Sequence, residues 1–123
     1  MDSTCLLYIA DFSSQDELVM FVNEKFEGNL INETLYLKNH NIEIDFDENE
    51  DFDLRKSSNQ YDGFLYFPYK LWINFNDSFT TENFIQFVNV FLKYFDNSKK
   101  KVVAACDYEE KLIHNGDIRP NSL

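Results

Sequence analysis

Residues 80–95 carry a pattern of apolar side chains that predicts an amphipathic helix. The apolar positions recur at intervals of three and four, which places them on one helix face: Phe84, Phe87, Val88, Phe91, Leu92 and Phe95. Thr80 is positioned to cap the N-terminus, and Phe79 before it to pack against Phe84. Asn97 and Ser98 are expected to end the helix.

A second helix is predicted over residues 14–26. Ser14 and Glu17 have the spacing of a capping box, in which each side chain bonds to the backbone N–H of the other residue. Apolar residues continue at helical spacing as far as Phe26. Gly28 lies where a residue in the left-handed conformation would end this helix.

Alternating and purely apolar segments predict the strands. Residues 42–47 alternate strictly between apolar and acidic side chains, so this strand should have one buried and one solvated face. Residues 102–106 contain no polar side chain other than a thiol, which predicts a central strand covered on both faces. The polar stretch 47–60 is expected to be a mobile loop. Further strands are expected at residues 6–9, 34–38, 64–67 and 71–75.

Together these elements predict one α+β domain that spans residues 1–123. Its sheet is expected to be mostly antiparallel and packed by two main helices at about residues 14–26 and 80–95, with strand 102–106 at the centre. Phe91, in the middle of the apolar stripe, is expected to pack against Val103 or Ala105 of that strand.

The negative charge is concentrated in the first half of the chain. Residues 1–62 carry 15 acidic and 4 basic side chains, whereas residues 63–123 carry 7 of each, so the net charge of −11 comes from the first half. Because phosphates are held mainly by Lys and Arg, a chain this acidic is unsuited to binding nucleic acid directly. Its electrostatic field favours association with basic surfaces.

The sequence has no feature of a membrane protein or of a secreted one. No run of 18 or more apolar residues is present, and the N-terminus lacks the positive region of a signal peptide. Cys5 and Cys106 fit no metal or redox spacing, so both are interpreted as buried, unreactive thiols in a reducing compartment. We therefore expect a cytoplasmic protein without contact to a membrane.

Catalytic and metal-binding motifs are not indicated either. His40 and His114 each lie in a polar stretch, which favours solvated loop side chains over catalytic ones. Nucleophile elbows, phosphate-binding glycine loops and Cys–His pairs with a known spacing do not occur. Residues 45–56 imitate a calcium loop, but the sixth position is Glu50 instead of Gly and the twelfth is Lys56 instead of Glu. We expect no enzyme, no metal and no cofactor.

An acidic stretch between residues 45 and 53 is the main candidate for a binding site. Its carboxylates belong to Asp45, Asp47, Glu48, Glu50, Asp51 and Asp53. One interpretation is a solvated, disordered loop that keeps the protein in solution. The other is a docking surface for a cationic partner, with three aromatic residues as candidate anchors: Tyr61, Tyr69 and Trp72. A further acidic cluster consists of Asp107, Glu109 and Glu110.

The second half of the chain resembles a group of bacterial proteins. The aromatic-rich helix, the lysine-rich turn after it and the run Val102–Leu112 are similar to immunity proteins of contact-dependent growth inhibition systems, and residues 62–69 resemble the same group. Proteins of that group neutralise ribonuclease toxin domains. The resemblance therefore implies that this chain binds a basic toxin nuclease and occludes it stoichiometrically, without assigning the contact residues.

Two other functions are compatible with the same residues. One is an acidic adaptor or regulatory interaction domain unrelated to toxins, and the other is a small hydrolase that uses acidic side chains. An antidote gene should lie directly after its toxin gene, so the genomic neighbourhood separates the immunity function from the adaptor and the hydrolase.

Overall fold

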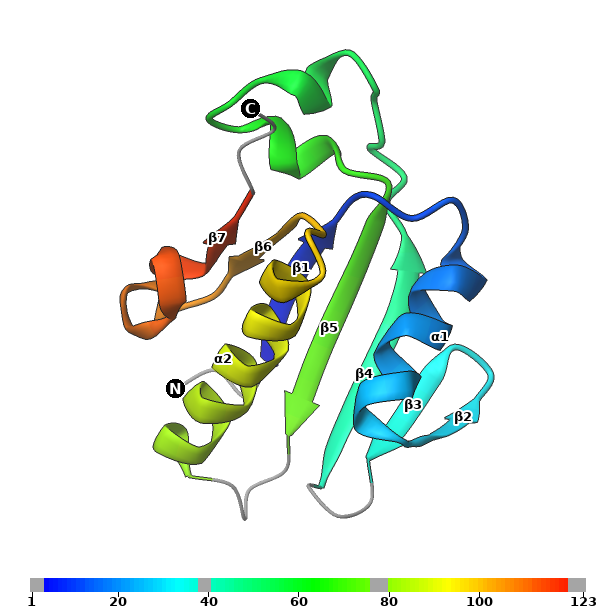
Figure 1. The fold of residues 1–123 in the computed structure, drawn as a ribbon, viewed down its shortest axis with the longest axis vertical. Helices are drawn as coiled ribbons and strands as arrows, with labels where there is room; N and C mark the ends of the chain where they lie inside the picture. The colour runs from blue at the N-terminus through cyan, green and yellow to red at the C-terminus, as the bar shows by residue number, and fades with distance from the viewer. Residues whose placement is uncertain (1–3, 38–40, 76–79, 120–123) are drawn as a thin grey trace.

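Seven strands form one antiparallel sheet, and two α-helices pack against it, in the residues that this computed structural model describes, 4–37, 41–75 and 80–119 (Figure 1). The helices are α1 (Gln15–Phe26) and α2 (Thr81–Asn97). The strands are β1 (Thr4–Ile9), β2 (Asn29–Ile31), β3 (Thr34–Leu37), β4 (Ile42–Glu48), β5 (Tyr69–Phe75), β6 (Val102–Ala105) and β7 (Asp117–Ile118). Their order in the sheet is β2-β3-β4-β5-β1-β6-β7. The predicted α+β class is confirmed.

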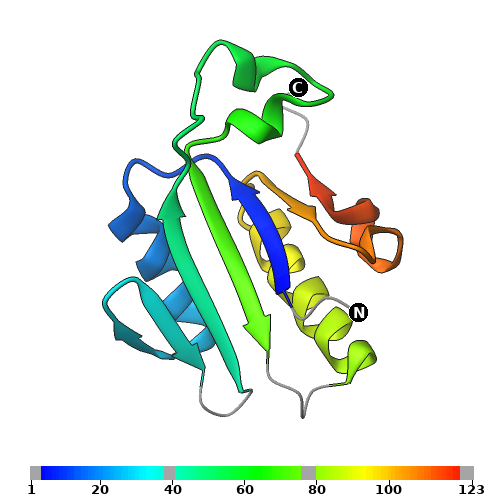
Figure 2. The ribbon, with the colours of Figure 1, turned by 180° about the vertical axis from the view of Figure 1, so that it is seen from behind.

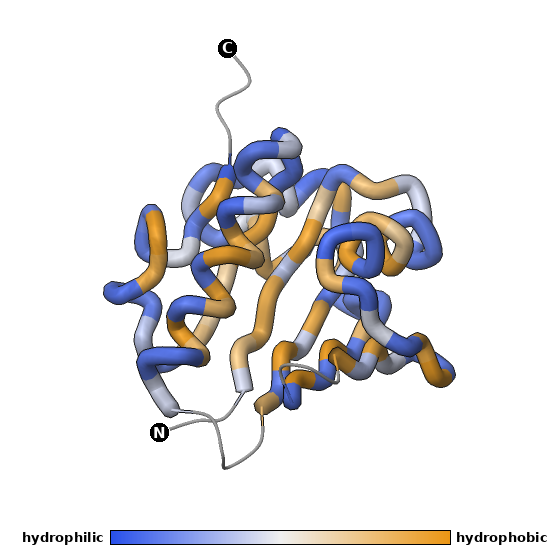
Figure 3. The backbone as a smooth tube through the Cα atoms, turned by 60° about the horizontal axis from the view of Figure 1, so that its bottom comes forward, coloured by the Kyte–Doolittle hydropathy of each residue, from blue (hydrophilic) through white to orange (hydrophobic). Residues whose placement is uncertain are grey.

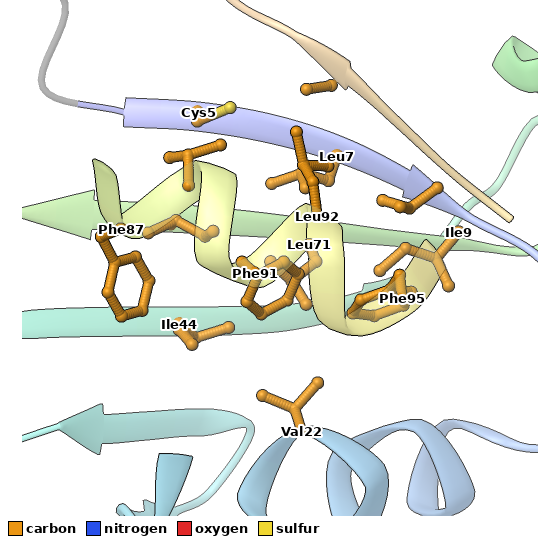
Figure 4. Close-up of a cluster of buried hydrophobic side chains, with 14 of the residues drawn as sticks. Cys5, Leu7, Ile9, Val22, Ile44, Leu71, Phe87, Phe91, Leu92 and Phe95 are labelled. Carbon is orange, nitrogen blue, oxygen red and sulfur yellow. The ribbon is translucent and has the colours of Figure 1, made fainter. Parts of the chain in front are cut away.

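The apolar residues of alternate strand positions meet on the face that the helices cover. The register places Ile44 of β4 opposite Ile73 of β5, and Leu71 of β5 opposite Leu7 of β1. Figure 4 shows Phe87, Phe91 and Phe95 of α2 pointing toward these strands, and Figure 3 shows the alternation of apolar and polar residues along the backbone. Apolar side chains that recur every second residue along the strands thus pack against apolar side chains that recur about every 3.6 residues along the helices.

Both helices have the predicted N-cap residues and face the sheet side by side, although the Glu17 carboxylate accepts a hydrogen bond from the Ser13 hydroxyl. The side chains of Ser14 and Thr80 each accept a hydrogen bond from the backbone N–H three residues on, at 3.1 Å. All six residues of the predicted α2 stripe are buried. The ring of Phe21 on α1 stacks on that of Tyr94 on α2 with centroids 4.3 Å apart, and the Tyr94 hydroxyl donates to the Phe21 carbonyl oxygen at 2.8 Å. The predicted contact of Phe79 with Phe84 lies outside the described residues.

Two predictions about strands are wrong. Residues 64–67 do not form a strand, because Gly63–Tyr66 is the short 3-10 helix η3. Strand β6 is buried on both faces over Val102–Ala104, as predicted, but it is not central: it lies between β1 and the two-residue strand β7, and β5 occupies the middle of the sheet. Long-range pairing sets this order, and the apolar run at residues 102–106 does not encode it.

The prediction about Phe91 was right about burial and wrong about its neighbours. Phe91 is fully buried, but Val103 and Ala105 pair with Tyr8 and Leu6 on the sheet face away from α2. The ring of Phe91 instead stacks on Phe26 of α1, with centroids 5.5 Å apart.

The end of α1 also differs from the prediction. The left-handed residue is Glu27, with φ of 49°, and not Gly28. Gly28 serves another purpose, since a Cβ there would lie 2.8 Å from the Tyr36 carbonyl oxygen and 2.7 Å from Leu37. The missing side chain lets the chain pass close against β3 on its way into β2.

Candidate functional site

Neither α1 nor α2 covers the second face of the sheet, which we call the open face (Figure 2). Its side chains alternate with the buried ones, and the strand register defines them. From β3 to β6 they are Thr34 and Tyr36; Glu43, Asp45 and Asp47; Lys70, Trp72 and Asn74; Thr4, Leu6 and Tyr8; and Val103 and Ala105. Acidic and aromatic residues therefore lie side by side on this face of the sheet.

Asp45 lies within a hydrogen-bond network that crosses four strands. The Thr34 hydroxyl donates to one carboxylate oxygen of Asp45 at 2.5 Å, and the Asn74 amide donates to the other at 2.8 Å. The Thr4 hydroxyl in turn donates to the side-chain carbonyl oxygen of Asn74 at 2.8 Å. Each carboxylate oxygen can accept two hydrogen bonds, so Asp45 is fixed in orientation and still has acceptor capacity left.

Aromatic residues flank the carboxylates. Trp72 is half-buried and pairs across the strands with Asp45 on one side and Leu6 on the other. Tyr36 pairs with Glu43 in the same way. Directly opposed side chains of antiparallel strands have Cβ atoms about 4.5–5.5 Å apart, so each of these aromatic residues is the immediate neighbour of an acidic one. A hollow of about 320 Å³ opens at this end of the sheet, lined by Tyr36, Leu37, Asn41, Ile42, Glu43, Asn74 and Phe75.

The other end of the open face is bounded by the 49–68 loop, which joins β4 to β5. Asn49 is only 4% exposed and closes the base of this loop. Its side-chain amide nitrogen donates to the backbone carbonyl oxygens of Leu65 at 2.9 Å and Phe67 at 2.7 Å. Its side-chain carbonyl oxygen accepts from the Asp51 N–H at 3.1 Å. Within the loop, a Cβ on Gly63 would lie 2.6 Å from the Ser57 carbonyl oxygen, so the two turns pack backbone against backbone.

Hydrogen bonds therefore organise this loop, where the sequence predicted a mobile one. The carboxylate of Asp53 accepts from the backbone N–H groups of Arg55 at 3.0 Å and Lys56 at 3.1 Å, which starts the short helix η2 (Lys56–Ser58). The ring of Phe64 in η3 packs edge-on against Tyr8 of the open face, with centroids 5.5 Å apart. The loop and the open face are thus continuous.

Large apolar side chains are exposed on this loop. Leu54 and Tyr61 are 76% and 77% exposed, and Phe52 and Leu65 are exposed to a lesser degree. The carboxylates of Glu50 and Asp51 are exposed on the same loop. Exposed aromatic and aliphatic groups next to charges are typical of residues that anchor protein–protein contacts.

The predicted site residues fall into three places. Asp45, Asp47 and Trp72 lie on the open face, whereas Glu48, Glu50, Asp51, Asp53 and Tyr61 lie at the end of β4 or on the 49–68 loop. Tyr69 faces the helices and is 8% exposed, so the prediction that it is an exposed anchor is wrong. Burial, with the charges of Glu48 and Glu17 adding to it, raises the pKa of Tyr69 above its usual value.

The third place holds the second acidic cluster. Asp107, Glu109 and Glu110 are exposed after β6, at the end of the sheet opposite the 49–68 loop. The carboxylate of Glu109 accepts a hydrogen bond from the Cys106 N–H at 3.2 Å, which fixes the local turn. This cluster is therefore separate from the acidic stretch.

Sequence reasoning missed four members of the open face and its border. Glu43 was predicted to face solvent but was not included in the site, although its place in the alternating strand marks it. Thr34, Asn74 and Asn49 have no local signal, because the partners that place them on this surface lie 11 to 70 residues away in the sequence.

Within the part of the chain that the structure describes, the acidic charge is almost entirely unpaired. Asp117 forms the one ion pair found there, with Arg119, and it lies outside the acidic half of the chain. Lys70 pairs across the strands with Asp47, but its ammonium group lies over the ring of Tyr8, 5.9 Å from the centroid. The carboxylates of the open face and the loop are thus available to cations from outside.

Comparison with known protein families, with curated proteins and with solved structures finds no match for this chain. The described helices include none with the length and apolar character needed to cross a bilayer. Among the described residues, no three His, Cys, Asp or Glu side chains are grouped as ligands for a metal ion.

Proposed function

We propose that this protein is an immunity protein that binds a cognate basic toxin nuclease, a ribonuclease, in the cytoplasm. It acts by stoichiometric occlusion, with its acidic surface held against the toxin's substrate cleft or docking surface. Catalysis, metal ions and direct contacts with nucleic acid or membranes have no part in this function.

The observation that supports this proposal is the unpaired acidic charge on an ordered framework. The carboxylates of Asp47, Glu48, Glu50 and Asp51 are exposed where β4 passes into a hydrogen-bonded loop. Like charges held close together repel one another, which lowers the stability of the folded protein. A basic partner relieves this repulsion, and a nuclease cleft that binds a polyanion is such a partner.

The direct test uses the product of the reading frame next to this gene. The purified product should cleave RNA, and one molar equivalent of this protein should abolish the cleavage. A neighbouring product that cleaves no RNA, or that keeps its activity in excess of this protein, contradicts the proposal. In the latter case, an acidic adaptor function would remain.

A second test asks whether the acidic stretch makes the contact. Replacing Asp47, Glu48, Glu50 and Asp51 together by Asn and Gln should slow association at low salt about tenfold, because steered association exceeds the unsteered 10⁵–10⁶ M⁻¹s⁻¹. At about 0.5 M salt the Debye length falls to about 4 Å and the two rates should converge. The control neutralises four acids on the helix side: Asp16, Glu24, Glu82 and Asp96. If both variants associate equally fast, the acidic stretch is not the contact surface.

A further inference from the structure

The geometry of the open face points to a specific ligand chemistry. We propose that this face binds arginine side chains of the partner, with the guanidinium group stacked on Trp72 and paired with the carboxylates of Asp45 and Glu43. The inference rests on the proposed function, because that function supplies the basic partner. It adds where the cationic groups bind and which cation is preferred.

The net negative charge of the open face favours a cationic ligand. From β3 to β6 the open face carries three carboxylates, Glu43, Asp45 and Asp47, against one ammonium group, that of Lys70, which leaves a net charge of −2. On β7, Asp117 is already paired with Arg119. Lys70 lies toward the 49–68 loop, opposite Asp47. The part of the face around Glu43 and Asp45 therefore has no cation of its own among the described residues.

Asp45 is preorganised as an acceptor. Its two oxygens are already oriented by Thr34 and Asn74, so a further hydrogen bond costs little side-chain entropy. Each oxygen keeps one acceptor position, and a planar donor with two parallel N–H groups can bond to both oxygens of a carboxylate at once. Such a planar pair of donors belongs to arginine, whereas the lysine ammonium is a point charge.

Trp72 supplies the second reason for arginine. Trp72 lies directly opposite Asp45 on the neighbouring strand, so that an aromatic residue and a carboxylate are cross-strand neighbours on the open face. Tryptophan is the best aromatic partner for a cation, and a guanidinium group can lie flat on the ring while its edge bonds to the carboxylate. The hollow of about 320 Å³ beside Tyr36, Glu43 and Asn74 gives room for the side-chain stem of a second arginine.

The experiment uses Trp72 as its own reporter, because it is the only tryptophan in the chain. The full-length protein is titrated with a peptide of five arginines and with a peptide of five lysines, and the emission of Trp72 is followed. The arginine peptide should change the emission and bind about tenfold more tightly than the lysine peptide of equal charge. Equal midpoints, or heat of binding without a change in emission, would overturn the inference.

Variants test the residues of the site. Glu43→Gln and Asp45→Asn together should weaken arginine-peptide binding about tenfold or more. The matched control, Glu24→Gln with Glu82→Gln, removes two exposed charges on the helix side and should change it much less. Glu43→Gln alone serves if the Asp45 variant does not fold. Trp72→Leu should abolish the preference for arginine over lysine, which is measured by calorimetry.

The same variants separate this inference from the proposed function. If the toxin is bound and inhibited by the Trp72→Leu and Glu43→Gln/Asp45→Asn variants as by wild type, the arginine site is wrong while the immunity function stands. If the neighbouring gene product is not bound at all, the immunity function fails, and the peptide titrations still decide whether the face selects arginine.

Discussion

The two faces of strand β4 carry opposite chemistry within seven residues. Ile42, Ile44 and Phe46 face the helices and are buried, whereas Glu43, Asp45 and Asp47 alternate with them on the open face. The buried set is required for folding, since each apolar side chain removed from water contributes about 1.5–3 kcal/mol. The acidic set contributes no such burial and adds repulsion between neighbours. We infer that the apolar residues of β4 serve folding and that its acidic residues serve binding.

The same division runs across the whole sheet. The covered face is apolar from Cys5 to Ile118, and aromatic stacking joins its two helices. The open face has a polar network at its centre, from Thr4 through Asn74 to Asp45 and Thr34. Substitutions on the covered face should therefore change stability before binding, and substitutions on the open face should change binding before stability.

The largest effect is expected from Phe91→Ala on the covered face. Removal of this fully buried ring leaves a cavity between α1 and α2 and should lower the free energy of unfolding by about 3–5 kcal/mol. Urea unfolding measures the loss, and binding of the partner by the folded fraction should be unchanged. Trp72→Ala on the open face is the matched comparison and should destabilise less but bind more weakly. A melting temperature for Phe91→Ala within a degree or two of wild type would contradict this account of the core.

A smaller loss is expected where the open face meets its loop. Asn49→Ala removes the buried amide that donates to the carbonyl oxygens of Leu65 and Phe67, and should cost about 1–3 kcal/mol. Amide hydrogen exchange in the 49–68 loop should become faster while α2 keeps its protection. Asn59→Ala is the control, because it removes exposed turn contacts, to the N–H groups of Tyr61 at 2.8 Å and Asp62 at 3.4 Å. Equal exchange in the two variants would show that Asn49 does not hold the loop.

Local patterns were sufficient to predict some elements and insufficient for others. The α2 stripe, both N-caps and the alternation of β4 depend on residues within one or two turns of each other, and the structure has all of them. The aromatic run 64–67 has strand propensity, yet the distant Asn49 bonds to its carbonyl oxygens and η3 forms instead. Strand propensity is a local property, so it does not predict a hydrogen bond to a distant residue.

The candidate site divides in the same way. The acidic side chains were evident from the sequence, since their density is a local property. The hydrogen-bond network that orients Asp45 was not evident. It includes Thr4 and Asn74, which lie 70 positions apart, and only the pairing of β1 with β5 brings them together. The position of Tyr69 was mistaken for a related reason: the strand begins at Tyr69, so its parity sets it on the covered face.

The third prediction concerns alkaline pH and the covered face. Burial raises the pKa of Tyr69 and of Tyr94, with the carboxylates of Glu48 and Glu17 adding to the first and that of Glu24 to the second. The folded state then holds these protons at a pH where the unfolded state has released them. Stability should therefore be full below the ordinary tyrosine pKa of about 10 and fall as pH rises through the raised values. Urea midpoints between about pH 8 and 11 measure the fall. Tyr69→Phe should make it shallower, and an unchanged slope in that variant would exclude this cause.

The smallest effect is expected at the rim of the covered face, where the pairing of Leu6 with Ala105 brings Cys5 and Cys106 to neighbouring positions. Cys5 is fully buried and Cys106 half-buried, so the expectation that both thiols are inert needs testing at Cys106. A hydrogen bond with Cys5 lowers the pKa of the Cys106 thiol, aided by the Tyr108 N–H and opposed by burial and by the carboxylates of Glu109 and Asp107.

Native protein treated with iodoacetamide should therefore be labelled at Cys106 alone, and at both thiols after unfolding. Because the thiolate is the reactive form, the labelling rate should reach half its maximum below the ordinary thiol pKa of about 8.5. Cys5→Ala removes the hydrogen bond and should move that midpoint to higher pH. A lowered pKa also means that Cys106 adds stability above the ordinary value and that this contribution is lost as pH falls through the lowered one. An identical midpoint in Cys5→Ala would show that the two thiols do not interact, and equal labelling of both in the native state would show that Cys5 is not shielded by the core.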